Sequence, residues 1–285
     1  MSSSRPLSSL SFPLPRHRSD EQLLQTSNPP DPNASVTLPP EILDKILEHV
    51  PITGEGRRML AACALVATWW TGPCQRRLYS SVSIHGGNYE RWMNGVVTPG
   101  SKTHLLDHVR SLEHCRVVYC PTMRDLAWGS GEYFLALRNL QSLTLSSIKI
   151  EYIGDDQFPT RFSSFRETLT YLSFSTLIAS FGALVALVNY FPNVATLELH
   201  RFILEPDEGP ISSSSRPLRG RKLHIHEVLS NHSESFNRFS ESNLEYEELV
   251  IDSHFPLGTK FLDRALQIST GTVKFLRLAA YLRRE

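Results

Sequence analysis

The chain has 285 residues, of which 41% are hydrophobic and 20% are charged, and its 29 basic and 29 acidic residues cancel to a net charge of zero. This composition is that of a globular protein with one or two cores, and it excludes a strongly charged surface that would demand nucleic acid as a partner. Four cysteines in this length exclude a disulfide scaffold and favour a reduced, intracellular protein.

The most apolar stretch of the chain, residues 177–191, contains Ser180, Gly182 and Asn189. It therefore falls short of the roughly 20 continuous apolar residues that a membrane span requires. We expect a soluble protein of the cytoplasm or the nucleus, or of both, with neither a membrane nor a nucleic acid as partner.

Residues 1–35 are dense in serine and proline and hold few apolar residues to bury. Burial in such a segment does not offset the entropy that is lost on ordering, so we expect a disordered leader. The first acidic residue is Asp20, which leaves a targeting peptide as an alternative, although Pro13 and Pro15 would interrupt its amphipathic helix.

The segment LPPEILDKILEHV, residues 38–50, predicts a helix with a well-marked start. Pro39 and Pro40 stand where a missing amide hydrogen costs little, and the carboxylate of Glu41 is favoured by the positive end of a helix. Apolar residues follow at helical spacing, with charged residues on the opposite side. The apolar positions are Ile42, Leu43, Ile46, Leu47 and Val50.

The next segment, RRMLAACALVATWWTGP, predicts a second helix that carries two apolar stripes. The first stripe is Leu60, Cys63, Ala67 and Trp70, and the second stripe is Ala62, Leu65, Val66 and Trp69. A bundle of about 45 residues is too small to bury both stripes by itself. Either the rest of the chain or another protein must cover the remaining stripe, and spacing alone leaves both possibilities open.

These two helical segments, followed by QRRLYSSVSI, resemble the F-box, the helical module by which adaptor proteins dock onto the Skp-type subunit of a cullin-RING ubiquitin ligase. The resemblance covers residues 36–80. It implies that a Skp-type subunit contacts Leu38, Pro39, Ile42, Leu43, Leu65, Val66 and Trp70. The sequence departs from the family at Thr68 and Trp69, where polar or basic residues are usual, so either tryptophan of the pair could be interfacial.

Residues 81–285 contain an internal repeat in which apolar residues (Φ) follow the pattern Φ-x-x-Φ-x-Φ. Taking the fourth position of each copy as an anchor gives Val82, Leu112, Leu143, Leu172, Leu197, Leu223, Leu249 and Leu276. The anchors are 30, 31, 29, 25, 26, 26 and 27 residues apart. Helix-like stretches precede several anchors, such as residues 181–193 and 259–267. This arrangement resembles a degenerate leucine-rich repeat of the kind often found behind an F-box.

Physical reasoning leads to the same α/β architecture. A unit of this length cannot bury its own apolar face, but stacked units share one parallel sheet and form a curved solenoid. Because strand side chains alternate, the residues on either side of each anchor should face the open, concave surface. We expect a protein target there, with candidate contacts Tyr171, Ser173, Glu198, His200, Lys222, His224, His226, Glu248 and Arg277. A solvated face without a partner is the alternative.

A search for chemistry indicates no catalytic residues, no cofactor and no metal site. His114, Cys115 and Cys120 lack a second pair at zinc spacing. His224 and His226 lack a third ligand and an obvious carboxylate partner, so we expect an exposed pair. The polar segment 205–222 predicts an exposed loop, and its basic end offers a candidate site for a phosphorylated segment, with a merely solvated loop as the alternative. The cations of this end are Arg216, Arg219, Arg221 and Lys222.

We therefore predict an adaptor that is not itself an enzyme. Its N-terminal helices would dock onto a Skp-type subunit and, through it, a cullin ligase, while the solenoid would hold an unknown protein substrate. The alternatives are a repeat scaffold that binds proteins without any ligase, and an enzyme with an unrecognised site. The last repeat stops soon after its strand, so Ala279–Glu285 would either begin a short helix or belong to a longer protein.

Overall fold

The structure is a computed structural model that describes residues 38–98, 102–115, 132–149, 158–205, 218–226, 244–253 and 273–280. The described residues from Pro40 onward belong to one compact unit, and of the residues before it only Leu38 and Pro39 are described. The predicted leader and the predicted helix at 259–267 therefore lie outside the described residues.

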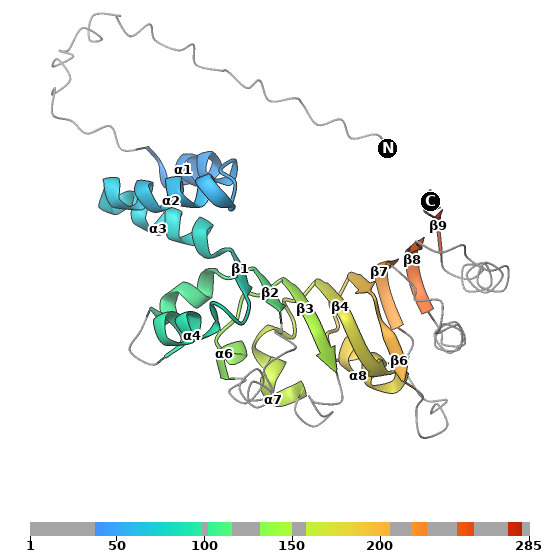
Figure 1. Cartoon of the computed structure of the whole chain (residues 1–285). Coiled ribbons are helices and arrows are strands. Elements are labelled where there is room, and N and C mark those ends of the chain that lie inside the picture. Colours follow the sequence, from blue (N-terminus) through green and yellow to red (C-terminus); the bar gives the residue numbers. More distant parts are fainter. Residues whose placement is uncertain are drawn as a thin grey trace, which may run out of the picture. The chain divides into compact units, whose positions relative to one another are not determined.

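Three helices open the compact unit: α1 (Pro40–Glu48), α2 (Gly54–Val66) and α3 (Thr68–Tyr79) (Figure 1). Helix α1 starts at Pro40 and ends before Pro51, as the sequence predicts. The prediction of one continuous second helix is wrong, because the chain breaks at Ala67, where φ is −153° and ψ is 149°. The residues after the break, Thr68 to Trp70, are β-branched or aromatic and lose side-chain freedom in a helix, which favours an interruption there.

A small core joins these helices. Its buried members are Leu43, Leu47, Val50, Leu60 and Cys74. Arg77 Nη2 donates to the carbonyl oxygens of Glu48 and Val50 at 2.7 and 3.1 Å, which satisfies groups that the end of α1 leaves free. Arg76 Nη2 donates to both carboxylate oxygens of Asp44, at 2.9 and 2.8 Å, and ties α3 to α1 a second time.

The rest of the described chain builds one parallel sheet in which neighbouring strands follow chain order (Figure 1). The strands in this order are β1 (Ser81–Ile84), β2 (Ser111–Cys115), β3 (Ser142–Lys149), β4 (Tyr171–Ser180), β5 (Thr196–His200), β7 (Leu218–His226), β8 (Leu244–Ser253) and β9 (Phe275–Ala280). Strand β6 (Ile203–Glu205) pairs in parallel with the last residues of β4. The predicted parallel sheet of an α/β protein is confirmed.

All eight predicted anchors stand opposite one another in this sheet, from the Val82–Leu112 pair of β1 and β2 to the Leu249–Leu276 pair of β8 and β9. The first seven anchors are buried, and Leu276 on the last strand is partly buried. Leu223 is also paired, in strand β7, although its copy of the repeat is a poor one. Sequence spacing therefore determines the register across the sheet.

Short helices connect the first five strands: α4 (Tyr89–Trp92), η1 (Met93–Val97), η2 (Thr103–His108), α6 (Glu132–Leu135), α7 (Phe158–Phe162), η5 (Ser163–Phe165) and α8 (Phe181–Tyr190). Figure 1 shows α6, α7 and α8 along the same side of the sheet. Helix α8 confirms the helix predicted before Leu197, and Ser180 caps it by accepting a bond from the Ala183 amide at 3.2 Å. Ala279 and Ala280 continue β9, so the alternative that a helix begins at Ala279 is wrong.

The backbone repeats one hydrogen-bond arrangement where successive strands begin. Two consecutive amides donate to one carbonyl of the preceding strand segment. The amide pairs and their acceptors are Arg110 and Ser111 to Ser80, Gln141 and Ser142 to Arg110, Thr170 and Tyr171 to Gln141, Ala195 and Thr196 to Thr170, and Arg221 and Lys222 to Ala195. Four residues after the anchors of β3, β4 and β5, the chain turns through positive φ at Ser147, Thr176 and Arg201.

The sheet and its helices share one large apolar core. The anchors of β1 to β8 line it, as do the residues two positions after them on β1, β3, β4, β5, β7 and β8, and helix aromatics such as Phe134, Phe162 and Phe165 fill it. None of the described helices is long and apolar enough to cross a membrane.

Candidate functional site

The second apolar stripe of the N-terminal helices lies at the surface. Leu65 and Val66, at the end of α2, are 87% and 76% exposed, and Trp69 is 37% exposed. The first stripe, by contrast, packs inward through Leu60, Cys63 and Trp70. On α1 and α2, Ile42, Ile46 and Met59 add exposed apolar area. The described residues of the chain thus leave this stripe uncovered.

The structure divides the residues that the F-box resemblance implied as contacts. Leu38, Pro39, Ile42, Leu65 and Val66 are exposed. Leu43 is fully buried in the small core, so the expectation that it contacts a partner is wrong. Trp70 is half-buried against the same core, which makes Trp69 the more accessible tryptophan of the pair. The two rings touch, with centroids 5.4 Å apart.

The other candidate surface is the open face of the sheet, formed by the residues on either side of each anchor. The predicted alternation is confirmed for most of these residues, which are half-buried on β3, β4, β5, β7 and β8 and exposed on β9. Ser173 and Val250 are exceptions with 3% exposure each. Ser173 therefore does not offer the target contact that was predicted for it.

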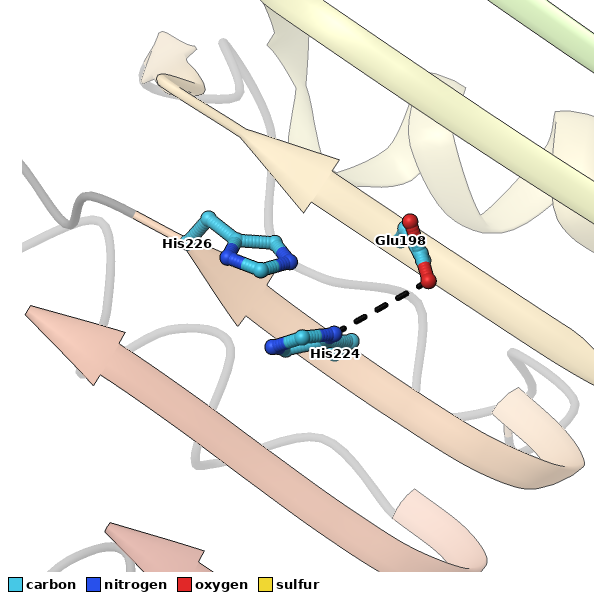
Figure 2. A group of neighbouring side chains, drawn as sticks. All are labelled: Glu198, His224 and His226. Carbon is cyan, nitrogen blue, oxygen red and sulfur yellow. Dashed lines mark ion pairs between the residues drawn. The ribbon is translucent and has the colours of Figure 1, made fainter. Parts of the chain in front are cut away.

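Three histidines and two carboxylates come together at the β5, β7 and β8 part of this face, and we call this group the histidine cluster: Glu198, His200, His224, His226 and Asp252. Glu198 stands opposite His224, and His200 stands opposite His226, which in turn stands opposite Asp252. Figure 2 shows Glu198 and the two β7 histidines side by side on neighbouring strands.

Short contacts connect the histidine cluster. His224 Nε2 lies 2.8 Å from Asp252 Oδ2, and its other ring nitrogen, Nδ1, lies 3.8 Å from Glu198 Oε1. His226 Nδ1 lies 3.4 Å from the same Asp252 oxygen. The ring of His226 stacks on that of His200 with centroids 4.0 Å apart. The expectation that His224 and His226 form an exposed pair without a carboxylate partner is therefore wrong.

Tyr171 orients the carboxylate of Glu198 by donating its hydroxyl to Oε2 at 2.6 Å. Burial and this bond raise the pKa of Tyr171 to about 12, so the hydroxyl keeps its proton. Burial acts to raise the pKa of Glu198, but the bonds from Tyr171 and His200 and the neighbouring histidines outweigh it, and the net shift is downward. Glu198 is accordingly an ionised acceptor.

His226 behaves differently from an ordinary surface histidine. Burial in the first place, and then the neighbouring His200 and His224, lower the pKa of His226 to about 4. The ring is therefore neutral at physiological pH and offers a lone pair.

Lys222 and Glu248, two further charged candidates of the open face, form an ion pair between strands, and Arg219 and Glu245 form another. Lys222 Nζ lies 3.3 Å from Glu248 Oε1, and Arg219 Nε lies 2.7 Å from Glu245 Oε2. Two of the four cations suggested for a phosphorylated segment thus have carboxylate partners. Arg216 lies outside the described residues, and the prediction of a loop is wrong from Leu218 onward, where β7 begins. Arg277 on β9 is exposed.

The pairing of neighbouring strands carries the information that sequence reasoning missed. The two consecutive anchor intervals of 26 residues, Leu197 to Leu223 and Leu223 to Leu249, bring positions 198 and 224 into one row and positions 200, 226 and 252 into the next. Each strand taken by itself predicts these residues only as separate candidates and does not predict their contacts with residues of the neighbouring strands. Comparison of the chain with protein-family models and with curated proteins finds no match.

Proposed function

We propose that this protein is a substrate-recruiting adaptor of an SCF-type ubiquitin ligase, which docks onto a Skp-type subunit through its N-terminal helices and holds a protein target on its sheet. The observation that carries the proposal is the exposure of Leu65 and Val66 at the end of α2. In a region whose small core is complete without them, two adjacent aliphatic side chains at 87% and 76% exposure indicate a binding surface.

The position of this surface agrees with the resemblance of residues 36–80 to an F-box. Leu65 and Val66 are among the residues that the resemblance implies as contacts, as are the exposed Leu38, Pro39 and Ile42. The chain break at Ala67 ends α2 directly after Val66, so the pair stands at a helix end with Trp69 nearby in sequence. These helices are the part that we assign to the ligase.

The sheet is the part that we assign to the target, and we interpret it as a leucine-rich-repeat-like solenoid. Three repeating features support this interpretation: the opposed anchors, the paired amides that share one carbonyl, and the positive φ four residues after three anchors. Each recurs at the same place in successive units, as expected for stacked copies of one motif. A target bound there would meet the ligase at raised effective concentration.

Capture of the full chain by a purified Skp-type subunit tests the docking step. We expect the wild-type chain to bind and the Leu65→Asp, Val66→Asp double variant to lose binding at least about 100-fold, because buried unpaired carboxylates are costly at an interface. Leu135→Asp is the matched control, since Leu135 on α6 is also exposed and apolar, and it should bind like the wild type.

Truncation of Leu43 would be a poor test, because loss of this core side chain disturbs the fold of the helices themselves. A wild-type chain that fails to bind the Skp-type subunit, or a double variant that binds equally well, would contradict the docking proposal. Either result would favour the alternative, a protein-binding repeat scaffold that acts without a ligase.

A further inference from the structure

We propose that Glu198, His224 and His226 bind a divalent transition-metal ion of the Zn²⁺ class on the open face of the sheet. Each of the three residues has one ligand atom, a carboxylate oxygen or a ring nitrogen, and these atoms all lie within 4.8 Å of one another. The residues come from the neighbouring strands β5 and β7, whose register holds them in place, and all three are half-buried (Figure 2).

The distances are close to those of a metal site. An ion with four tetrahedral ligands at about 2.0 to 2.1 Å holds the ligand atoms about 3.4 Å apart. His224 Nδ1 and Glu198 Oε1 are already 3.8 Å apart. The other pairs of ligand atoms lie no more than 4.8 Å apart, so the proposal requires rotations about side-chain bonds that bring the three ligands around one ion.

The second contacts of these ligands have the arrangement that metal sites use. A ligating histidine commonly donates its other ring N–H to a carboxylate, which fixes its orientation and makes it a better ligand. When Nδ1 of His224 binds the ion, its Nε2–H donates to Asp252 Oδ2, which lies 2.8 Å away. Tyr171 likewise holds Oε2 of Glu198 and leaves Oε1 for the ion.

Asp252 supplies an independent observation. Its Oδ1 atom is buried and accepts no hydrogen bond from the described residues. A buried carboxylate oxygen without a partner is costly, and a cation nearby offsets that cost. Together with Glu198, Asp252 gives the histidine cluster two negative charges, which match a divalent ion.

The kind of ligand decides the class of metal. Two imidazoles and one carboxylate suit Zn²⁺ and its neighbours in the first transition row, whereas Ca²⁺ and Mg²⁺ prefer oxygen ligands alone. Three protein ligands leave a fourth position of a tetrahedral ion for water or for a group of a bound molecule.

Titration of the purified full chain with Zn²⁺, in competition with a chromophoric chelator, tests the proposal. We expect one Zn²⁺ per chain at this site, which excess Mg²⁺ or Ca²⁺ does not displace. Asp252→Asn should weaken binding about 10- to 100-fold by removing the partner of His224. His224→Asn, His226→Asn and Glu198→Gln should each weaken it by more, because each removes a ligand atom.

His49→Gln is the matched control, since His49 is an exposed histidine at the end of α1, and it should leave the affinity unchanged. If none of the three ligand variants weakens Zn²⁺ binding, or if the wild-type chain binds no Zn²⁺, the proposal is wrong. Equal losses in His49→Gln and His224→Asn would show adventitious binding by surface histidines and would overturn it too.

A measurement on the wild-type chain alone keeps the proposal testable if the ligand variants fail to fold. Diethyl pyrocarbonate modifies accessible histidine rings, and peptide mass spectrometry reports the extent at each site. We expect Zn²⁺ to protect His224 and His226 at least about tenfold more than His49, because coordinated nitrogens have no free lone pair. Equal modification of His224 and His226 with and without Zn²⁺ would overturn the proposal.

Discussion

The N-terminal helices and the open face of the sheet display their candidate sites in opposite ways. The helices leave aliphatic side chains such as Leu65 and Val66 exposed beside a small, complete core. On the open face, the polar side chains of the histidine cluster contact one another between strands and are half-buried. Covering an apolar surface of the first kind with another molecule is favourable, because it removes that surface from water. The polar groups of the second kind already have most of their hydrogen-bond and ion-pair partners within the chain.

This difference separates the roles of the two regions. Substitutions at the exposed stripe should change binding and leave folding intact, because the stripe makes few contacts within the chain. Substitutions in the histidine cluster should change both, because each of its side chains is a partner of another one.

The largest expected change in stability can be tested within one helix, because α2 has both a fully buried leucine and a highly exposed one. Leu60→Ala should lower the free energy of unfolding of the N-terminal helices by about 2 to 5 kcal/mol, since it leaves a cavity in their core. Leu65→Ala should change it by less than about 0.5 kcal/mol, because Leu65 is 87% exposed. Urea unfolding followed by tryptophan fluorescence measures both, and equal losses would contradict the assignment of Leu65 to a binding surface.

A smaller effect tests the sheet at Gly220 on β7. A Cβ atom added there would lie 2.5 Å from Cε1 of Tyr246, a fully buried ring, and 3.2 Å from the carbonyl oxygen of Ala195. Gly220→Ala should therefore cost about 1 to 3 kcal/mol of stability through overpacking. Capture by a Skp-type subunit should remain at the wild-type level. Gly95→Ala, where nothing lies within 4 Å of the added atom, is the control in thermal unfolding.

The histidine cluster should make the stability of the folded chain depend on pH. The pKa of His226 is about 4 in the folded chain, against 6.5 for an ordinary histidine, so between these values the unfolded chain holds a proton that the folded chain lacks. Stability is then full above about pH 6.5 and falls as the pH drops towards 4. In the presence of a chelator, His226→Gln should flatten this fall in urea midpoints. An unchanged slope would contradict the shifted pKa.

The smallest effect concerns the backbone after β4's anchor. Thr176 is exposed and has a φ of 57°, a region that disfavours β-branched residues. Thr176→Gly should raise stability by about 0.5 to 1 kcal/mol, because glycine adopts this φ without strain. Ser175→Gly, one position earlier in the regular strand, should lower it by a similar amount. Thermal unfolding of the two variants gives the sign directly.

The sequence predicts the sheet better than it predicts the helices. Each anchor such as Leu172 or Leu197 is marked by a period of two inside a longer repeat, and this double pattern determines both strand and register. On α1, in contrast, Ile42 and Leu43 are both apolar and belong to adjacent lines of one helix. The pattern does not say that Leu43 turns inward and Ile42 outward, since this choice depends on where α3 packs.

The histidine cluster illustrates a different limit. The alternation predicts correctly that Glu198, His224 and His226 share one face, but their proximity depends on the register in which neighbouring strands pair. That register follows when the anchors are placed opposite one another, so the sequence alone could have predicted it. The break at Ala67 is only weakly indicated by the sequence, because the β-branched and aromatic residues Thr68 to Trp70 disfavour a helix but are themselves helical in α3.

The shared carbonyl where successive strands begin has a consequence for how this protein can change over time. In β2, β3, β4, β5 and β7, the two amides before the anchor donate to the carbonyl two residues before the neighbouring anchor, so pairing with the preceding strand begins at that point whatever the length of the connection. The connections between anchors already vary from 25 to 31 residues while the anchors stay opposed. Insertions and deletions in these connections therefore leave the rows of the open face aligned, so that evolution is free to exchange single face residues against an unchanged frame.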